Sequence, residues 1–95
     1  MYAVIFRAEA NNLDQNYSDM ATALRELALQ QFGCTEFVAT SEKGYEIAIS
    51  YWPDLDSIQS WKNHPLHKEA QELGKSKWYK SYRVQVVEVL REYGR

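Results

Sequence analysis

The sequence predicts an α+β fold with the element order β-α-β-β-α-β, in which a four-stranded antiparallel sheet carries its helices on one face. Apolar residues alternate with a period of two in four short segments. Between these segments, apolar residues recur at helical spacing. The chain has 95 residues, of which 45% are hydrophobic. This length and composition suit one domain over residues 1–95 with one core.

The first half of the chain predicts a strand and then a helix. Residues 2–8 alternate with largely apolar side chains on both sides, which is typical of an interior strand. Asp14 or Ser18 can cap a helix that runs to about Gln31. Gly33 is suited to end this helix, because a helix often stops at a glycine in the left-handed region.

A hairpin follows. Residues 34–41 and 45–52 both predict strands, and the latter segment shows the clearest alternation in the chain. Residues 42–44 are Glu-Lys-Gly and predict the turn between these strands. We therefore expect the two strands to lie side by side.

The second helical region is predicted to be broken in two. Asp54 or Asp56 starts a short helix. Pro65 stops it and begins another, which runs to about Lys77, because proline is favoured at the first position of a helix. The last strand lies within residues 79–92. The complete pattern is the split βαβ, or ferredoxin-like, arrangement.

Charge and composition exclude several function classes. A net charge of -2 and a pI near 5.6 oppose phosphate binding, so no nucleic-acid partner is expected. No apolar run approaches the about 20 residues of a membrane span, so no membrane partner is expected. Cys34 is the only cysteine, and the chain opens without a leader pattern, which predicts a cytoplasmic protein. Metal and nucleotide motifs such as CxxC, HExxH or a glycine-rich loop are absent.

The sheet face away from the helices is predicted to be apolar and to need a cover. RNA is a poor candidate, because Glu46 and Ile47 replace the small residue and the stacking aromatic of an RNA-binding motif. A second copy packed face to face would form a dimeric α/β barrel, so we expect a homodimer. Depending on register, the open face carries either Ala3, Ile5, Ala48, Val87 and Val89 or the Tyr and Ile residues of the hairpin.

Several blocks of sequence carry a family resemblance over nearly the whole chain. They are Ser50-Tyr51-Trp52, Ser57-Ile58-Gln59-Ser60-Trp61-Lys62, residues 64–71 and residues 74–84. Together they resemble the antibiotic biosynthesis monooxygenase (ABM) domain family. The resemblance implies a homodimer with a pocket in each subunit between the helices and the sheet. It also implies an oxygenase without metal, flavin or other prosthetic group, in which an ionised phenol passes an electron to O₂.

The resemblance extends to a haem-degrading branch, from which this sequence departs twice. That branch has an iron-ligating His ten residues after a Trp, whereas here Gln71 stands ten residues after Trp61. Phe6 and Arg7 stand near where that branch has an Asn. Because a neutral amide does not replace imidazole as an iron ligand, we expect no haem and no other cofactor.

His67 is the candidate catalytic residue. Its imidazole has a pKa suited to proton transfer near neutral pH, so it could act as a base or as a hydrogen-bond donor. Alternatively, His67 packs on Trp61 or on the sheet, and His64 caps a helix or lies in an exposed loop. Two histidines without a carboxylate or cysteine at ligand spacing predict no metal site.

The candidate substrate-binding residues are aromatic or hydrogen-bonding. His67, Ala70, Gln71, Gly74 and Trp78 share one helical stripe, beneath which we place the pocket. Gly74 either opens this pocket or lets the helix and the sheet pack closely. The cluster from Trp78 to Arg83 suits either a pocket or a dimer interface. The full set is Tyr51, Trp61, Gln71, Trp78, Tyr82 and Arg83.

The predicted function is that of a cofactor-independent monooxygenase acting on a small hydrophobic aromatic compound, such as a phenol or quinol. The alternative is a non-catalytic homodimer of the same fold that binds a small ligand or serves as a stress or regulatory module. A base with supporting polar groups would favour the enzyme, and here the sequence offers only His67 among aromatic residues.

Overall fold

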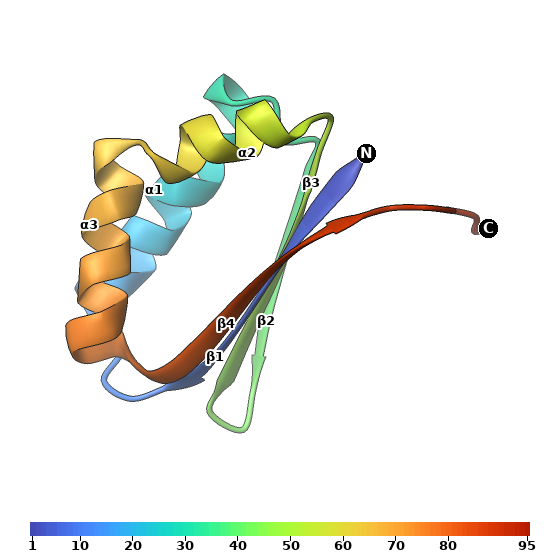
Figure 1. Ribbon diagram of the computed structural model, residues 1–95. Coiled ribbons are helices and arrows are strands. Elements are labelled where there is room, and N and C mark those ends of the chain that lie inside the picture. The colour runs from blue at the N-terminus through green and yellow to red at the C-terminus, as the bar shows by residue number, and fades with distance from the viewer.

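The computed structural model describes residues 1–95 and has the predicted order of elements (Figure 1). The strands form one antiparallel sheet in the order β2-β3-β1-β4, so the predicted ferredoxin-like α+β fold is confirmed. The strands are β1 (Tyr2–Ala10), β2 (Glu36–Glu42), β3 (Tyr45–Trp52) and β4 (Tyr79–Glu88). The helices are α1 (Gln15–Gln31), α2 (Leu55–Lys62) and α3 (Pro65–Leu73), and α3 continues into a π-helical turn, η1 (Gly74–Trp78).

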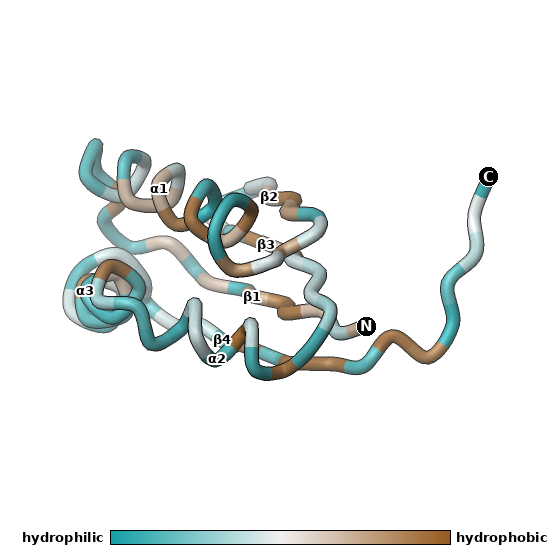
Figure 2. Tube along the Cα trace, turned by 90° about the horizontal axis from the view of Figure 1, so that it is seen from above, coloured by the Kyte–Doolittle hydropathy of each residue, from teal (hydrophilic) through white to brown (hydrophobic).

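The helices all lie on one side of the sheet, which we call the covered face (Figure 1). The C-terminal segment after β4 leaves on the other side, the open face, and extends away from the body of the protein (Figure 2). None of the helices combines the length and the apolar character needed to span a membrane. The sheet therefore has one face packed by helices and one face without a helical cover.

Side-chain caps determine where the helices begin. Asp14 and Asp54 each accept a hydrogen bond from the backbone N–H three residues further on, at 2.9 and 2.7 Å. The Nδ1 atom of His64 accepts a hydrogen bond from the backbone N–H of Leu66 at 3.1 Å, and Pro65 takes the first position of α3. Each cap satisfies a backbone donor that the first helical turn leaves free. The predicted capping roles of these three residues are confirmed.

Two chain reversals use the left-handed region of backbone space. Gly33 has a φ of 81° directly after α1. Lys43 and Gly44 have φ values of 51° and 83°. Positive φ at both central residues is typical of the two-residue turn that suits the twist of a hairpin. This turn joins β2 to β3 and aligns the two strands.

The strand register decides which residues share a face of the sheet. Ala3 pairs with Tyr51 and Val87, whereas Phe6 pairs with Ala48. Because neighbouring residues of a strand point to opposite faces, Ala48 lies on the covered face. The predicted Tyr and Ile set of the hairpin therefore lies on the open face, and of the other set only Ala48 points to the covered face. The open face combines residues of both sets: Ala3, Ile5, Ile47, Ile49, Tyr51 and Val87.

The core lies between the covered face and the helices, around Trp52. This side chain is fully buried, and its Nε1–H donates a hydrogen bond to Ser50 Oγ at 2.8 Å. Its ring centroid is 5.1 Å from that of Trp61, whose own Nε1–H donates to the backbone oxygen of Leu24 at 3.1 Å. Two buried indoles with paired N–H groups thus join β3, α2 and α1.

Candidate functional site

A cavity of about 610 Å³ lies between the helix layer and the covered face; we call it the inner cavity. All three helices, η1 and all four strands contribute to its walls. A cavity of this size and apolar character is typical of a small-molecule site. Its aromatic lining residues are Phe6, Tyr17, Phe37, Trp61, Trp78, Tyr79 and Tyr82.

The predicted helical stripe faces this cavity. His67, Ala70, Gln71, Gly74 and Trp78 all line it. The stripe continues through η1, so Trp78 remains on the same side as His67. The location predicted for the pocket, beneath this stripe, is confirmed.

Gly74 allows close packing and does not open the cavity. A Cβ atom at this position would lie 3.1 Å from Cδ2 and 3.2 Å from Cε2 of Tyr79. The aromatic ring of Tyr79 thus occupies the space that a side chain at Gly74 would need. Of the two alternatives from the sequence, close packing is the one the structure has.

One end of the inner cavity is formed by His67, Gln71 and Lys62, which we call the histidine end. The Nε2 atom of Gln71 lies 2.9 Å from Nδ1 of His67 and 3.4 Å from the backbone oxygen of Lys62. The His67 ring stands edge-on to Trp61, with 4.3 Å between centroids. Burial lowers the pKa of His67, and the charge of Lys62 lowers it further. The imidazole is therefore neutral at pH 7.

The other end is formed by Tyr17, Tyr79 and Tyr82, which we call the tyrosine end. The ring centroid of Tyr79 is 5.4 Å from Phe6, 6.0 Å from Tyr17 and 6.2 Å from Tyr82. Burial raises the pKa of Tyr79, and the neighbouring Tyr17 side chain raises that pKa further. Burial also raises the pKa of Tyr17. Both hydroxyls therefore stay protonated and serve as hydrogen-bonding groups.

Trp78 closes the tyrosine end. It is 2% exposed, and its ring packs edge-on against Tyr17 with 5.2 Å between centroids. Its Nε1 atom is fully buried without a hydrogen-bond partner. Next to it, the Nζ atom of Lys77 pairs with Asp14 at 2.6 Å, and this contact lowers the pKa of the Asp14 carboxyl. The ion pair fastens η1 to the first turn of α1.

Two predicted binding residues, Tyr51 and Arg83, do not line the inner cavity. Arg83 pairs with Arg7 across the sheet, while its neighbours Tyr82 and Val84 line the cavity. Tyr51 pairs with Ala3 and lines a hollow on the open face. Alternation along a strand separates two faces, but it does not say which face the helices cover.

The remaining predicted site residues come together as expected in position. Trp61, His67, Gln71, Trp78 and Tyr82 all line the inner cavity. Gln71 was predicted to bind substrate, but in the structure its amide nitrogen contacts His67 Nδ1 and the backbone oxygen of Lys62. The structure brings no three His, Cys, Asp or Glu side chains together in a group that could hold a metal ion.

The sequence reasoning missed part of the cavity wall. Phe6, Tyr17 and Phe37 line it and were not predicted to bind a ligand, whereas Tyr79 belongs to the cluster for which a pocket was one alternative. A usable signal existed for Tyr17, which shares the apolar side of α1 with Leu24 at helical spacing. No comparable signal existed for the strand residues, because their direction depends on pairing with other strands.

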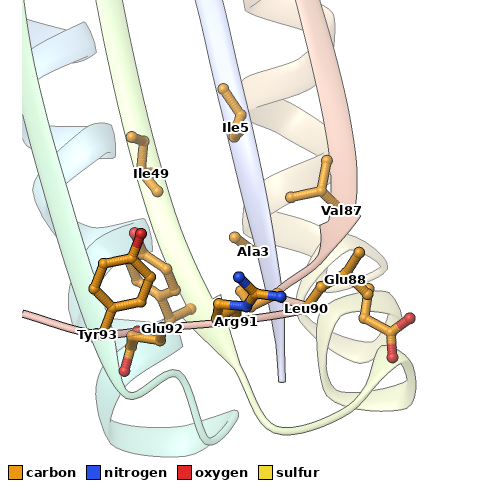
Figure 3. A pocket seen from close by; sticks show the side chains of 11 residues that line it. Ala3, Ile5, Ile49, Val87, Glu88, Leu90, Arg91, Glu92 and Tyr93 are labelled. Carbon is orange, nitrogen blue, oxygen red and sulfur yellow. The ribbon is translucent and has the colours of Figure 1, made fainter.

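A second hollow, of about 680 Å³, lies on the open face (Figure 3). Ala3, Ile5, Ile49 and Val87 gather on the sheet there, and the C-terminal segment passes in front of them (Figure 3). In that segment, residues 89–93 line the hollow. The hollow is thus an aliphatic sheet surface beside an extended tail, and it holds no histidine, cysteine or tryptophan.

Sequence comparison finds a relative that matches nearly the whole chain. The chain is 38% identical over 92 residues to the uncharacterized protein YqjZ of Bacillus subtilis. This alignment covers 96% of this chain and 81% of YqjZ. No model of a known protein family matches the chain.

Two solved structures share its architecture. SnoaB of Streptomyces nogalater, a cofactor-independent oxygenase, matches with a TM-score of 0.80 and 9% identity, over 99% of this chain and 97% of its own. An antibiotic biosynthesis monooxygenase matches with a TM-score of 0.72 and 15% identity, over 96% of this chain and 100% of its own. At such identities the likeness concerns the fold. The chain therefore belongs to the same family as YqjZ and has the fold of the antibiotic biosynthesis monooxygenases.

Proposed function

We propose that this protein is a cofactor-independent monooxygenase that oxidises a phenol or quinol in the inner cavity. The observation that carries the proposal is an aromatic-walled cavity around one neutral imidazole, that of His67. Aromatic walls suit a planar ring, and tyrosine hydroxyls and imidazole suit its oxygen substituents. The fold shared with SnoaB supports the reaction class.

The proposed reaction needs no reductant other than the substrate. A phenol loses its hydroxyl proton, and the anion passes one electron to O₂. The resulting radical pair combines into a peroxide at a ring carbon, and loss of water from this peroxide leaves a quinone. One oxygen atom of O₂ enters the product and the other leaves in water, so that phenol and O₂ give quinone and water.

The residues of the cavity have distinct proposed roles in this reaction. His67 promotes loss of the phenolic proton. Trp61 and Trp78, which are 8% and 2% exposed, shield the reactive intermediates from water. Tyr79 and Tyr82 bind the far side of the ring system at the tyrosine end. Because the protein contributes binding, proton loss and shielding, the site needs few polar groups.

Oxygen uptake over a panel of phenols, naphthols and anthrones tests the proposal. We expect at least one compound to consume O₂ and to give a product that has gained one oxygen and lost two hydrogens. His67→Leu removes the hydrogen-bonding ring nitrogens and should lower turnover on the order of 10²–10³-fold, and its melting curve checks that the fold is retained. The matched control is His64→Asn, which keeps a side-chain cap for α3 and should retain full turnover.

Two outcomes contradict this proposal. Full turnover by His67→Leu removes His67 from the mechanism. Tight binding of several panel compounds without any O₂ uptake would indicate a non-catalytic ligand-binding protein of the same fold and not an enzyme.

A second copy of the chain is the proposed partner on the open face. This face carries exposed apolar side chains, including Val38, Tyr45 and Val87 at 51%, 52% and 36% exposure. In the tail, Leu90 and Tyr93 are 89% and 87% exposed. Apolar groups exposed over this extent favour a protein partner, and two identical sheets packed face to face cover both surfaces at once.

Sedimentation equilibrium at micromolar concentration tests the homodimer. We expect a mass twice that of the 11.1 kDa chain. Removal of residues 90–95 should weaken the dimer, because the apolar tail then no longer contributes to the interface. A stable species with the mass of a single chain contradicts the proposed assembly.

A further inference from the structure

All charged side chains that line the inner cavity are cations. These are Arg25, Lys62 and Lys75, in a chain whose formal net charge is -2. None of them pairs with a carboxylate, because the one ion pair of the chain joins Lys77 to Asp14. Unpaired cations around an apolar cavity favour a ligand that carries negative charge.

Gln71 determines which nitrogen of His67 carries the proton. The backbone oxygen of Lys62 can only accept a hydrogen bond, so the amide nitrogen of Gln71, 3.4 Å away, is the atom that faces it. The same amide nitrogen lies 2.9 Å from Nδ1 of His67. An amide N–H donates, so Nδ1 accepts, and the proton of the neutral ring lies on Nε2.

The Nε2–H group of His67 is available to a ligand. It has no hydrogen-bond partner within the chain, and it is not fully buried, because Trp78 Nε1 is the one fully buried side-chain nitrogen or oxygen without a partner. His67 lines the inner cavity. Lys62 lies close enough for its charge to lower the pKa of the His67 ring. A donor and a cation therefore stand together at the histidine end.

The tyrosine end has the opposite preference. Glu46 lies on the covered face, one strand beyond Ala8 from Tyr82, and its carboxylate raises the pKa of both Tyr17 and Tyr79. A second negative charge at that end would be repelled by Glu46. An anionic ligand oxygen is therefore directed to the histidine end.

We propose that the inner cavity binds its aromatic ligand as the oxyanion, with the charged oxygen on the Nε2–H of His67 and beside Lys62. Gln71 is a positioning residue, because its amide keeps His67 a donor. This inference rests on the proposed oxidation for the reaction that follows binding. It specifies that His67 promotes ionisation by stabilising the phenolate, while the phenolic proton passes to water.

Binding of para-nitrophenol tests the proposal, because its phenolate absorbs visible light and its neutral form does not. An apolar cavity alone raises the pKa of a bound phenol, whereas an anion-binding end lowers it. We expect the protein to bind the phenolate about tenfold more tightly than the neutral phenol, so that the apparent pKa of the dye falls on binding. The methyl ether, para-nitroanisole, cannot ionise and should bind more weakly at every pH.

Three variants assign the effect to the named residues. Lys62→Gln should remove most of the preference for the phenolate. Gln71→Glu should reverse it, because a carboxylate accepts a hydrogen bond from Nδ1–H, which leaves Nε2 of the neutral ring as an acceptor. The matched control is Lys68→Gln on α3, since Lys68 does not line the cavity and should leave the preference unchanged.

Three results overturn the inference. They are tighter binding of the neutral phenol than of the phenolate, a phenolate preference in Lys62→Gln equal to that of the unmodified protein, or no binding of either form. The dye experiment involves no O₂ consumption, so it separates this inference from the proposed reaction. If the protein prefers the phenolate but turns over no compound of the panel, the proposed oxidation is wrong and the oxyanion-binding inference stands. If the protein turns over a compound but does not prefer the phenolate, the oxyanion-binding inference is wrong and the proposed oxidation stands.

Discussion

The two faces of this sheet are made by the same strands and differ in what they require from their surroundings. Trp52 on β3 is fully buried beneath the helices, with its N–H paired to Ser50. Tyr51, its neighbour, lies on the open face next to Ala3 and Ile49. The covered face is completed within one chain, whereas the open face has only the extended tail beside it. The alternating side chains of β3 thus contribute to both faces. One set packs in the core and lines the inner cavity on the covered face, and the other set lies on the open face, where we propose a partner.

This comparison predicts the largest difference in stability between two adjacent residues. Trp52→Ala leaves a large void in the core and should lower the free energy of unfolding by about 3–5 kcal/mol. Tyr51→Ala removes partner contacts instead, so its smaller effect should depend on protein concentration. Denaturant titrations at two protein concentrations measure both changes. Equal, concentration-independent losses for the two variants contradict the division between the faces.

A charge on the open face should break the proposed dimer. Ile49→Lys places an ammonium group in the apolar sheet surface, where an unpaired charge is costly once a partner excludes water. We expect sedimentation equilibrium to give the mass of a single chain for this variant. The control is Leu29→Lys on α1, an exposed position outside both hollows, which should leave the mass unchanged. A dimer that survives Ile49→Lys at micromolar concentration argues for a different interface.

A methyl group at Gly74 should disturb the tyrosine end without opening the sheet. The added Cβ would lie 3.1 Å from Cδ2 of Tyr79, whose ring is held between Phe6 and Tyr17. We expect Gly74→Ala to cost about 1 kcal/mol of unfolding free energy, since overpacking outweighs the better helix propensity of alanine. Gly94→Ala is the control, because a Cβ there meets nothing within 4 Å. A thermal melt distinguishes them, and a more stable Gly74→Ala contradicts the assigned packing.

The smallest expected effect is the pH dependence that comes from burial of His67. Its folded-state pKa is lowered from the ordinary value of 6.5, so below that pH the unfolded chain binds a proton that the folded chain does not. Stability should therefore fall as the pH drops from 6.5 toward the lowered folded pKa. Unfolding titrations across this range should show a shallower slope for His67→Gln than for the unmodified protein. The slope should persist in His64→Asn, and an unchanged slope in His67→Gln contradicts the burial.

Local signals explain which parts of the fold could be predicted from the sequence. The bounds of β3 match the predicted residues 45–52, because Gly44 before it and Pro53 after it are strong breakers. The start of α2 follows from the cap at Asp54, which needs only the next three residues. The π-helical turn was not predicted, because helical periodicity continues through residues 74–78 and does not distinguish it from α3. Features with a local signal were thus predictable, and features without one were not.

In the candidate site, too, the features that depend on neighbouring residues could be predicted and those that depend on other elements could not. The stripe from His67 to Trp78 follows from helical periodicity, and it faces the inner cavity as predicted. For Arg83 the sequence left pocket and interface open, because the direction of its side chain depends on pairing with Arg7 in β1, which places it on the open face. The tie between Gln71 and the backbone of Lys62 depends on the angle between two helices, which no single segment encodes.

Titration of the ¹⁵N-labelled protein with 2-naphthol tests most directly whether the ligand occupies the covered face. The three tryptophans give three indole N–H signals, and those of Trp61 and Trp78 report on the inner cavity. If the ligand enters the inner cavity, these two signals shift on titration, while the signal of the fully buried Trp52 and the backbone amides of Ile49 and Val87 move little. Shifts confined to Ile49, Val87 and the tail, with both cavity indoles unchanged, would contradict it and would move the ligand to the open face.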